Sequence, residues 1–451
     1  MGLGLHGGGL AVARWLAKNK AKVIITDLKN KNQLKNSINK LKGQLVTYHL
    51  GEHRVADFKK ADIVIQNPAV SRQSRFIKIA AKAGVQIENE AGLFFKLHNP
   101  KKIIGITGTR GKSTVSTLLH QILIQKYKRI KLAGNIGSTA MFDIVDNLKK
   151  NDYVILELSS WHLENLGDQN LSPYISVITN IMPDHLNRYK GLKDYTMAKV
   201  NILKFQDRED IAVLNYDNTI TKNMGKMVKG RRFWFSKKIF TDQNGLYLRN
   251  KNIYFRINGQ TNKICSLSAI KIKGDHNIEN VLAAITVAKI LNVKNNQIIK
   301  ALKEFRGVQY RLEFIRELRG VEYFNDTTST IPEATIAALK SFTSKNIVLI
   351  AGGTDKKLNF KNLARQIKIH CQAVILFEGQ GSNKIFNELK KIKFKSIINN
   401  VKTMQAAVGL AESMSKKSDV VLLSPACASF NLFVNEFDRG NQFNRVVSIL
   451  K

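Results

Sequence analysis

Short apolar runs alternate with amphipathic stretches along the whole chain, a pattern typical of α/β units. The amphipathic stretches at 10–19 and 112–126 predict helices. The short apolar runs predict buried parallel strands. We expect strands at residues 22–28, 62–67, 101–108, 152–158, 175–181, 210–215, 346–353, 373–379 and 419–425.

The predicted strands fall into three groups, and a chain of 451 residues is long enough for two or three domains. We therefore expect three α/β domains, at residues 1–98, 99–307 and 308–451. In the second group, residues 245–259 alternate between apolar and polar positions, which predicts antiparallel strands.

The net charge of +38 would attract phosphates, nucleic acid or anionic membranes. The excess is spread along the chain as lysine beside asparagine, as in 28–42, which favours solvated faces over a dedicated nucleic-acid site. No apolar run is long enough to span a bilayer, and the N-terminal residues lack a signal-peptide pattern. The three cysteines lack CxxC spacing, which favours a reducing cytoplasm over a disulfide framework or a zinc site.

The segment 105–114, GITGTRGKST, joins a predicted strand to a predicted helix, as a phosphate-binding loop does. Gly108 and Gly111 let the backbone curl so that its N–H groups face anionic oxygens. Lys112 can reach the β- and γ-phosphates, and Ser113 can ligate Mg²⁺. This segment predicts an ATP site; the alternative is an ordinary glycine-rich turn.

The N-terminal segment GLGLHGGG (2–9) is similar to a Rossmann fingerprint, with Asp27 placed to accept from a ribose hydroxyl. The first strand of such a unit should precede Gly2 and is absent from the sequence, so we expect a shortened domain or a late start. The fingerprint alone is compatible with either a nucleotide site or a structural turn.

Two further strand ends carry candidate metal ligands, Glu157 in LELSSWHLE and His185 in NIMPDHLNRY. Ligands bind at the strand ends of open α/β sheets, and carboxylate and hydroxyl oxygens suit Mg²⁺. Taken singly, a histidine such as His185 is more often structural than a ligand. By spacing alone, Lys199 is one more helix lysine. In the third domain, NDTTST (325–330), GGTDKK (352–357) and SPACASFNLF (424–433) are either turns or carboxylate-binding loops.

Taken in order, these motifs resemble the Mur ligase family. The resemblance is carried by GTRGKST, GNIG, ELSS, DH, GDHNIEN, YRLE, NDTTST and LLSPACASF, and it covers essentially the whole chain. The fold that it implies has a Rossmann-like N-terminal domain, a central P-loop ATPase-like domain and a Rossmann-like C-terminal domain. The segments ELSSWHLE and SPACASF…DRGNQF resemble most the members that act on D-glutamate.

The resemblance implies an ATP-dependent ligase of peptidoglycan synthesis, located in the cytoplasm and monomeric. It would join D-glutamate to UDP-N-acetylmuramoyl-L-alanine through an acyl phosphate and release ADP and phosphate. Cations must screen the two anions that meet, so two Mg²⁺ ions and basic side chains are implied. No nucleic-acid partner and no membrane insertion are expected.

The resemblance also implies roles for individual residues. His185 and Lys199 would belong to a second metal site, with Lys199 carbamylated by CO₂, and Lys112, Lys199 and His185 would be catalytic. Ser113 and Glu157 would hold the first Mg²⁺. The implied ATP site comprises Gly108, Thr109, Arg110, Gly111, Lys112, Ser113, Thr114, Asn277, Arg311 and Asp326. The implied sugar-nucleotide site comprises Leu5, His6, Asp27 and Asn135, and the implied D-glutamate site comprises Thr330, Lys356 and Ser429.

The chain departs from the family pattern at three places. Thr328 stands where a lysine is frequent, and His6 stands where a small hydroxyl residue is common. A phenylalanine that is often seen shortly after the ACAS segment is displaced, with Glu436 before Phe437. These departures bear on the amino-acid preference and the uracil contacts.

Three other functions remain open from the sequence. A basic ATPase that associates with nucleic acid would explain the charge, but not the ordered set of motifs. A binding protein that has lost catalysis would keep the fold, and a folate-glutamate ligase would share the superfamily.

Overall fold

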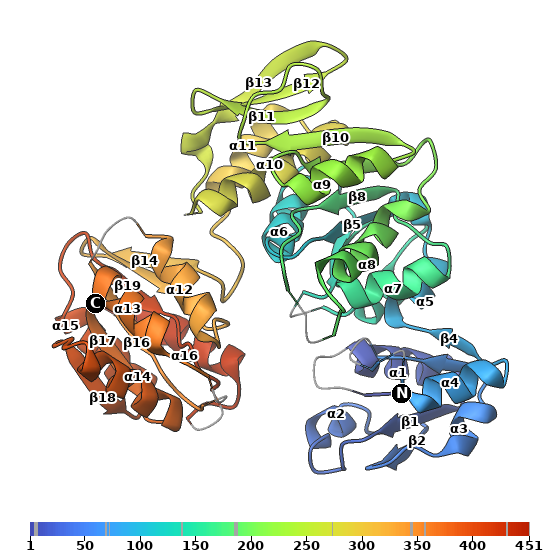
Figure 1. Ribbon diagram of the computed structural model, residues 1–451, viewed down its shortest axis with the longest axis horizontal. Coiled ribbons are helices and arrows are strands. Elements are labelled where there is room, and N and C mark those ends of the chain that lie inside the picture. The colour runs from blue at the N-terminus through green and yellow to red at the C-terminus, as the bar shows by residue number, and fades with distance from the viewer. Residues whose placement is uncertain are drawn as a thin grey trace. The chain divides into compact units, whose positions relative to one another are not determined.

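The structure is a computed structural model that describes residues 1–3, 8–67, 70–71, 73–136, 139–184, 188–272, 274–342, 346–355, 358–429 and 432–450. All nine strands predicted from apolar runs are present, each within the predicted range or shifted from it by a few residues. The chain divides into two compact units, residues 1–269 with 278–303, and residues 270–277 with 304–451 (Figure 1). The domain boundaries near residues 98 and 307 stay predictions.

The N-terminal part of the first unit contains two parallel strand pairs (Figure 1). β1 (Val23–Asp27) pairs with β2 (Val46–Leu50), and β3 (Ile63–Ile65) pairs with β4 (Gln86–Glu88). Residues 1–3 connect the two pairs, because Gly2 N donates to Thr26 O at 2.7 Å and Asn67 N donates to Met1 O at 3.0 Å. The helices of this part are α1 (Gly8–Lys18), α2 (Lys35–Asn39), α3 (Val55–Lys59), α4 (Arg75–Lys82) and α5 (Glu90–Leu97).

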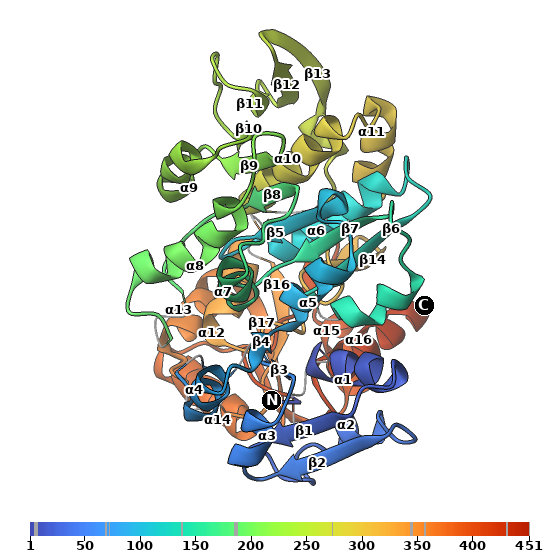
Figure 2. The ribbon, with the colours of Figure 1, turned by 90° about the vertical axis from the view of Figure 1, so that its right-hand side faces the viewer.

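The central sheet of the first unit has nine strands in the order β13-β12-β11-β10-β9-β8-β5-β7-β6 (Figures 1 and 2). The strands are β5 (Ile103–Thr107), β6 (Ile130–Gly134), β7 (Tyr153–Glu157), β8 (Ile175–Ile178), β9 (Ile211–Asn215), β10 (Arg231–Ser236), β11 (Gly245–Arg249), β12 (Asn252–Ile257) and β13 (Gln260–Ser266). The antiparallel pairing of β11 with β12 confirms the prediction for residues 245–259.

Helices accompany this sheet in the central part of the chain. They are α6 (Lys112–Leu123), α7 (Ser160–Asp168), α8 (Leu192–Lys204), α9 (Thr219–Met224), α10 (Asp275–Ile290) and α11 (Asn295–Glu304). In α6, Val115, Leu118, Leu119 and Ile122 are buried at i, i+3, i+4 and i+7, as one face of a helix requires. α6 packs against β5, β6 and β7. It begins at Lys112, shortly after β5 ends at Thr107.

Glu90, at the start of α5, is buried where the N-terminal part meets the short helix Met141–Asp143 of the central part. Its Oε1 accepts a hydrogen bond from Met141 N at 2.7 Å. Burial raises the pKa of the Glu90 carboxyl to about 7, and the main-chain donors at Met141 and Phe142 oppose that rise. Around it, Phe94 and Phe95 share one apolar cluster with Met141 and Phe142.

We expect Glu90→Gln to stabilise the protein more at pH 8 than at pH 5. The folded pKa of about 7 lies above the unfolded value, so the folded state binds more protons between pH 4.5 and 7. Stability therefore falls as pH rises across this window, by up to about 3 kcal/mol. Thermal unfolding of both proteins at each pH measures this, with exposed Glu209→Gln as the control. An equal change in Tm at both pH values would contradict it.

The second unit contains a six-stranded sheet in the order β14-β15-β19-β16-β17-β18. Only β14 (Glu313–Leu318) runs antiparallel to its neighbour; the others are β15 (Val321–Asn325), β16 (Ile347–Ala351), β17 (Cys371–Phe377), β18 (Ile397–Val401) and β19 (Val420–Leu423). Successive residues of β16 enter different cores, Ile347 and Leu349 one and Val348 and Ile350 the other. Helices therefore cover both faces: α12 (Pro332–Lys340), α13 (Lys361–His370) and α14 (Gln380–Lys391) on one, α15 (Met404–Ser413) and α16 (Glu436–Ile449) on the other.

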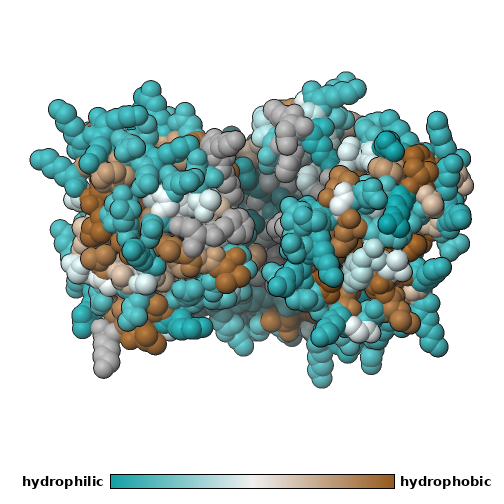
Figure 3. All heavy atoms as spheres, turned by 90° about the horizontal axis from the view of Figure 1, so that it is seen from below, coloured by the Kyte–Doolittle hydropathy of each residue, from teal (hydrophilic) through white to brown (hydrophobic). Residues whose placement is uncertain are grey.

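Hydrophilic side chains dominate the face shown in Figure 3, with hydrophobic residues scattered among them. The exposed lysines of 28–42 illustrate the pattern, since Lys29, Lys31, Lys35 and Lys40 all face solvent. Cys265, Cys371 and Cys427 are buried free thiols. Within the described ranges, no helix is both long and apolar enough to cross a membrane.

Candidate active site

The phosphate-binding loop predicted at 108–114 lies between the end of β5 and the start of α6. Gly108 and Gly111 have φ angles of 149° and 83°, a backbone region that side chains rarely adopt. The Lys112 Nζ donates to Gly108 O and Thr109 O, each at 3.1 Å, so the ammonium lies against the curled backbone. The loop therefore has the glycine geometry and the placed cation that phosphate binding requires.

Asn180, which follows β8, fixes the same loop. Its Oδ1 accepts from Arg110 N at 3.0 Å and its main-chain O accepts from Thr109 N at 2.8 Å. We did not predict Asn180 as a site residue. The sequence signal for Asn180 is its position two residues after the end of the apolar strand β8.

We expect Gly111→Ala to weaken ATP binding by about tenfold or more, because a Cβ there would overlap Asn280 Oδ1 while φ stays positive. The loop must shift to relieve that overlap, and its N–H groups then leave the phosphate. The KM for ATP measures the effect, and Gly191→Ala, where a Cβ meets nothing within 4 Å, is the control. An unchanged KM for ATP would contradict the assignment.

Glu157 ends β7, the strand beside β5, and is almost fully buried. Its Oε1 accepts from Asn135 Nδ2 at 3.2 Å, whereas its Oε2 has no hydrogen-bond partner among the described residues. A buried carboxylate oxygen without a donor fits a hard cation, and Ser113 on α6 supplies a hydroxyl oxygen. The described residues hold no cluster of three or more His, Cys, Asp or Glu side chains, and His185 lies outside them.

Lys199 lies on the buried face of α8. Its spacing in the sequence could not show whether it is buried or exposed. Its Nζ donates to Thr107 Oγ1 at 3.3 Å and lies 4.8 Å from the centre of the Tyr195 ring. Burial lowers the pKa of the Lys199 amine to about 7. Repulsion from Lys112 adds to this lowering, while Asp184 and Glu157 oppose it.

On the predicted sugar-nucleotide side, Asp27 is buried at the carboxyl end of β1. Its Oδ1 accepts from Lys29 N at 2.9 Å, which fixes the turn after the strand. Asn135 lies beside Glu157, as described above. Leu5 and His6 lie outside the described residues.

The second unit gathers its predicted residues at the carboxyl ends of three neighbouring parallel strands, β15, β19 and β16. Asp326 and Thr330 follow β15, and Ser429 follows β19. Ser429 is buried, and its Oγ has no hydrogen-bond partner among the described residues. The loop after β16 is tied to the loop after β19, because Thr354 N donates to Ala428 O at 2.9 Å; Lys356 lies outside the described residues.

Asp326 is a buried carboxylate held by its own unit. Its Oδ2 accepts from Ser424 Oγ at 2.7 Å and its Oδ1 from Leu312 N at 3.2 Å. Burial raises the pKa of Asp326 to about 6, against these donors and the charge of Arg311. Asn277, in the first turn of α10, and Arg311 belong to the same unit, whereas Lys112, Ser113, Glu157 and Lys199 belong to the first.

The departures from the family pattern have local structural roles. Thr328 Oγ1 donates to Tyr310 O at 2.8 Å, so a hydroxyl fixes the loop where a lysine is frequent. Glu436 opens α16, and its main-chain O accepts from Thr327 Oγ1 at 2.9 Å. His6 lies outside the described residues.

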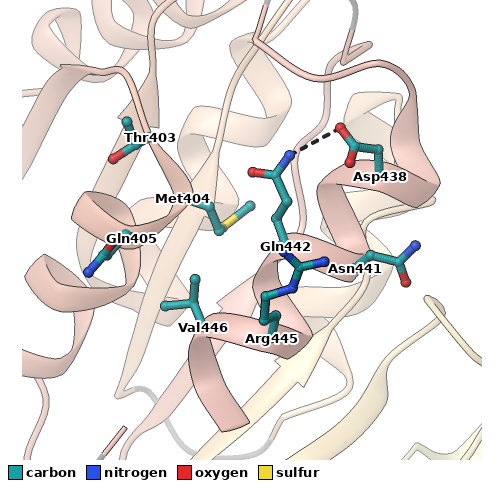
Figure 4. A pocket seen from close by; sticks show the side chains of 8 residues that line it. All are labelled: Thr403, Met404, Gln405, Asp438, Asn441, Gln442, Arg445 and Val446. Atoms are coloured by element: carbon teal, nitrogen blue, oxygen red, sulfur yellow. Dashed lines mark hydrogen bonds between the residues drawn. The ribbon is translucent and has the colours of Figure 1, made fainter. Parts of the chain in front are cut away.

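A surface pocket lies between the start of α15 and one face of α16 (Figure 4). Gln442 Nε2 donates to Asp438 Oδ2 at 3.1 Å across part of its wall, and Arg445 borders it. None of the residues predicted from the sequence lines this pocket. It is therefore separate from the candidate site.

Three family models match the chain in succession: the Mur ligase MurD-like N-terminal domain at residues 1–89, the Mur ligase middle domain at 106–288, and the Mur ligase glutamate ligase domain at 310–427. With the phosphate-binding loop and the buried Glu157, they define the class: the chain belongs to the Mur ligase family, with its three-domain α/β architecture.

Relatives within the family cover nearly the full chain. It is 40% identical to the UDP-N-acetylmuramoylalanine–D-glutamate ligase of Roseiflexus sp. (strain RS-1), over 99% of this chain and 97% of the relative. It is also 40% identical to the ligase of the same name from Borreliella afzelii (strain PKo), over 100% and 97%.

Solved structures of the family share the fold at low identity. The UDP-N-acetylmuramate–alanine ligase MurC of Thermotoga maritima aligns with a TM-score of 0.61 and 22% identity, over 99% of this chain and 98% of that one. The MurF ligase of Thermotoga maritima, solved in complex with ADP, aligns with a TM-score of 0.56 and 18% identity, over 97% and 99%.

Proposed function

We propose that this protein joins D-glutamate to UDP-N-acetylmuramoyl-L-alanine at the expense of ATP, in peptidoglycan precursor synthesis. The observation that carries the proposal is that two features occur on adjacent strands. Lys112 lies against the curled backbone of residues 108–111, and Glu157 has a buried carboxylate oxygen without a hydrogen-bond partner among the described residues. The full-length similarity to ligases of that name supports the choice of substrates.

The reaction needs phosphorylation because a carboxylate is a poor acylating agent. The L-alanine carboxylate attacks the γ-phosphorus, the bond to ADP breaks, and an acyl phosphate forms. The amine of D-glutamate then attacks the acyl carbon and phosphate leaves. Lys112 neutralises the charge on the transferred phosphoryl group, and the N–H groups of residues 108–114 orient the phosphates.

Ser113 and Glu157 would hold one Mg²⁺, since both offer the hard oxygens that this ion prefers. When bound, the ion would neutralise phosphate charge. Asn135 orients Glu157 by donating to its Oε1, which leaves Oε2 directed elsewhere. We further propose a second Mg²⁺ served by His185 and Lys199.

Lys199 would serve that second ion as a carbamate. Its amine, with a pKa lowered to about 7, is substantially neutral at neutral pH and can attack CO₂. The carbon–nitrogen bond forms, one proton leaves to solvent, and the neutral amine becomes an anionic carbamate. This exchange removes the repulsion between Lys199 and Lys112.

The remaining roles follow from the resemblance and the strand ends. Leu5, His6, Asp27 and Asn135 would bind the sugar nucleotide. Asn277, Arg311 and Asp326 would contact ATP, and Thr330, Lys356 and Ser429 would hold D-glutamate. The buried Ser429 hydroxyl, which lacks a partner among the described residues, supports its role. We also propose that the protein is a cytoplasmic monomer.

The test is phosphate release from ATP with UDP-N-acetylmuramoyl-L-alanine, with and without D-glutamate, and with L-glutamate, D-aspartate and D-glutamine as controls. We expect release that requires both substrates and prefers D-glutamate. Hydrolysis indifferent to the sugar nucleotide would contradict the proposal and favour an ATPase. RNA binding measured across a salt series would then test the nucleic-acid alternative.

A further inference from the structure

Arg439, in the first turns of α16, is the largest fully buried side chain among the described residues. Its guanidinium donates from Nε to Thr327 Oγ1 and from Nη2 to Thr327 O, both at 2.9 Å. Nη1 donates to Cys427 O at 3.4 Å. The acceptors of this cation among the described residues are therefore two carbonyls and one hydroxyl.

The acceptors of Arg439 lie on the two loops that carry the proposed amino-acid site. Thr327 lies between Asp326 and Thr330 after β15, and Cys427 lies two residues before Ser429 after β19. A further bond joins these loops directly, from Ala426 N to Ser329 O at 2.8 Å. The Arg439 side chain and this main-chain bond together fix the distance between the two loops.

α16 approaches the first loop closely enough to hold this arrangement. A Cβ on Gly440, the next residue, would lie 2.6 Å from Thr327 Cγ2. The Thr327 hydroxyl completes the contact by donating to Glu436 O at 2.9 Å. The guanidinium is therefore held on α16 in one geometry.

The charge of Arg439 has no ion-pair partner among the described residues. Burial lowers the pKa of its guanidinium to about 10, while Cys427 and Glu436 oppose the lowering, so it is cationic at neutral pH. A buried cation without a carboxylate is costly, because carbonyl dipoles only partly replace its hydration. An anion brought to the same loops would recover part of that cost.

We propose that Arg439 is a positioning residue that sets the loops after β15 and β19 for the amino-acid substrate, and that its unpaired charge favours an acidic substrate over a neutral one. The inference rests on the proposed function. Arg439 does not touch the substrate, because its side chain is fully buried. It acts through the electrostatic field of its guanidinium and through the positions of the two loops that it holds.

Three variants test this. Arg439→Met keeps length and removes charge, and Arg439→Lys keeps charge but cannot form the same fork of bonds. Arg445→Met removes the same charge from an exposed position on the same helix, at the border of the pocket in Figure 4. Phe443→Leu, in the core beneath α16, controls for loss of stability.

The readout is the ratio of kcat/KM for D-glutamate to that for D-glutamine, with the KM for ATP measured alongside. We expect Arg439→Met to lower this ratio about tenfold or more, mainly through the KM for D-glutamate. Arg439→Lys should change the ratio less than threefold even if it lowers Tm, and both control variants should leave it unchanged.

A ratio in Arg439→Met equal to that of Phe443→Leu would overturn the inference, since a purely structural role affects both amino acids alike. If Arg439→Met does not fold, a tenfold loss of the ratio in Arg439→Lys would overturn it equally. The wild type distinguishes failure of the proposed function from failure of this inference. If the wild type shows no phosphate release that depends on D-glutamate, both the proposed function and this inference are overturned. Normal release with an unchanged ratio in the variants overturns the inference alone.

Discussion

Lys112→Ala should lower phosphate release that depends on D-glutamate by about a thousandfold, because it removes the cation at the transferred phosphoryl group. The expected loss is in kcat as well as in ATP binding. The charge that Lys112 neutralises grows as the terminal phosphate leaves ADP. The structure places this ammonium against Gly108 O and Thr109 O, within the curled backbone of the proposed phosphate-binding loop. Single-turnover measurement at saturating ATP separates the chemical step from binding.

The control is Lys128→Ala, an exposed lysine beyond the C-terminal end of α6. That variant should keep turnover within about twofold, as surface substitutions do. Both variants should retain the wild-type Tm within a few degrees, since the Lys112 ammonium donates to main-chain carbonyls of its own loop, at Gly108 and Thr109. Turnover near the wild-type level in Lys112→Ala would remove the basis for an ATP site at residues 108–114.

The strands that the sequence predicted are those with their own apolar runs. Five consecutive residues of β5 are buried, as are five of β9, so pattern alone locates both. β2 and β6 were not predicted, because no residue of β2 and only two residues of β6 are buried, and β6 forms the edge of its sheet. Such strands depend on pairing with a neighbour, which single-sequence periodicity does not carry.

The candidate site divides in the same way. Lys112 and Glu157 could be assigned from local sequence, because a glycine-rich turn and a strand end are readable signals. The burial of Lys199 could not, since it depends on how α8 packs; the sequence pointed to it only through the resemblance. Arg439 could not be singled out from the sequence either, because its side chain bonds to two loops, at Thr327 and Cys427, that lie about one hundred residues apart in the chain.

Lys199→Ala should lower turnover by at least about a hundredfold, the loss expected when a group that stabilises transition-state charge is removed. Added bicarbonate should not restore it, because no amine remains to form the carbamate. In the wild type, removal of CO₂ should lower activity and bicarbonate should restore it.

The dependence on CO₂ should strengthen as pH falls through about 7. The Lys199 amine has a pKa lowered to about 7, so below that value it is increasingly protonated and cannot attack CO₂. Above it, the neutral amine prevails and carbamylation needs less bicarbonate. Lys193→Ala, an exposed lysine on the same helix, should show wild-type turnover and the same CO₂ dependence. Full activity in Lys199→Ala, or a wild type indifferent to CO₂ across this range, would show that Lys199 does not act as a carbamate.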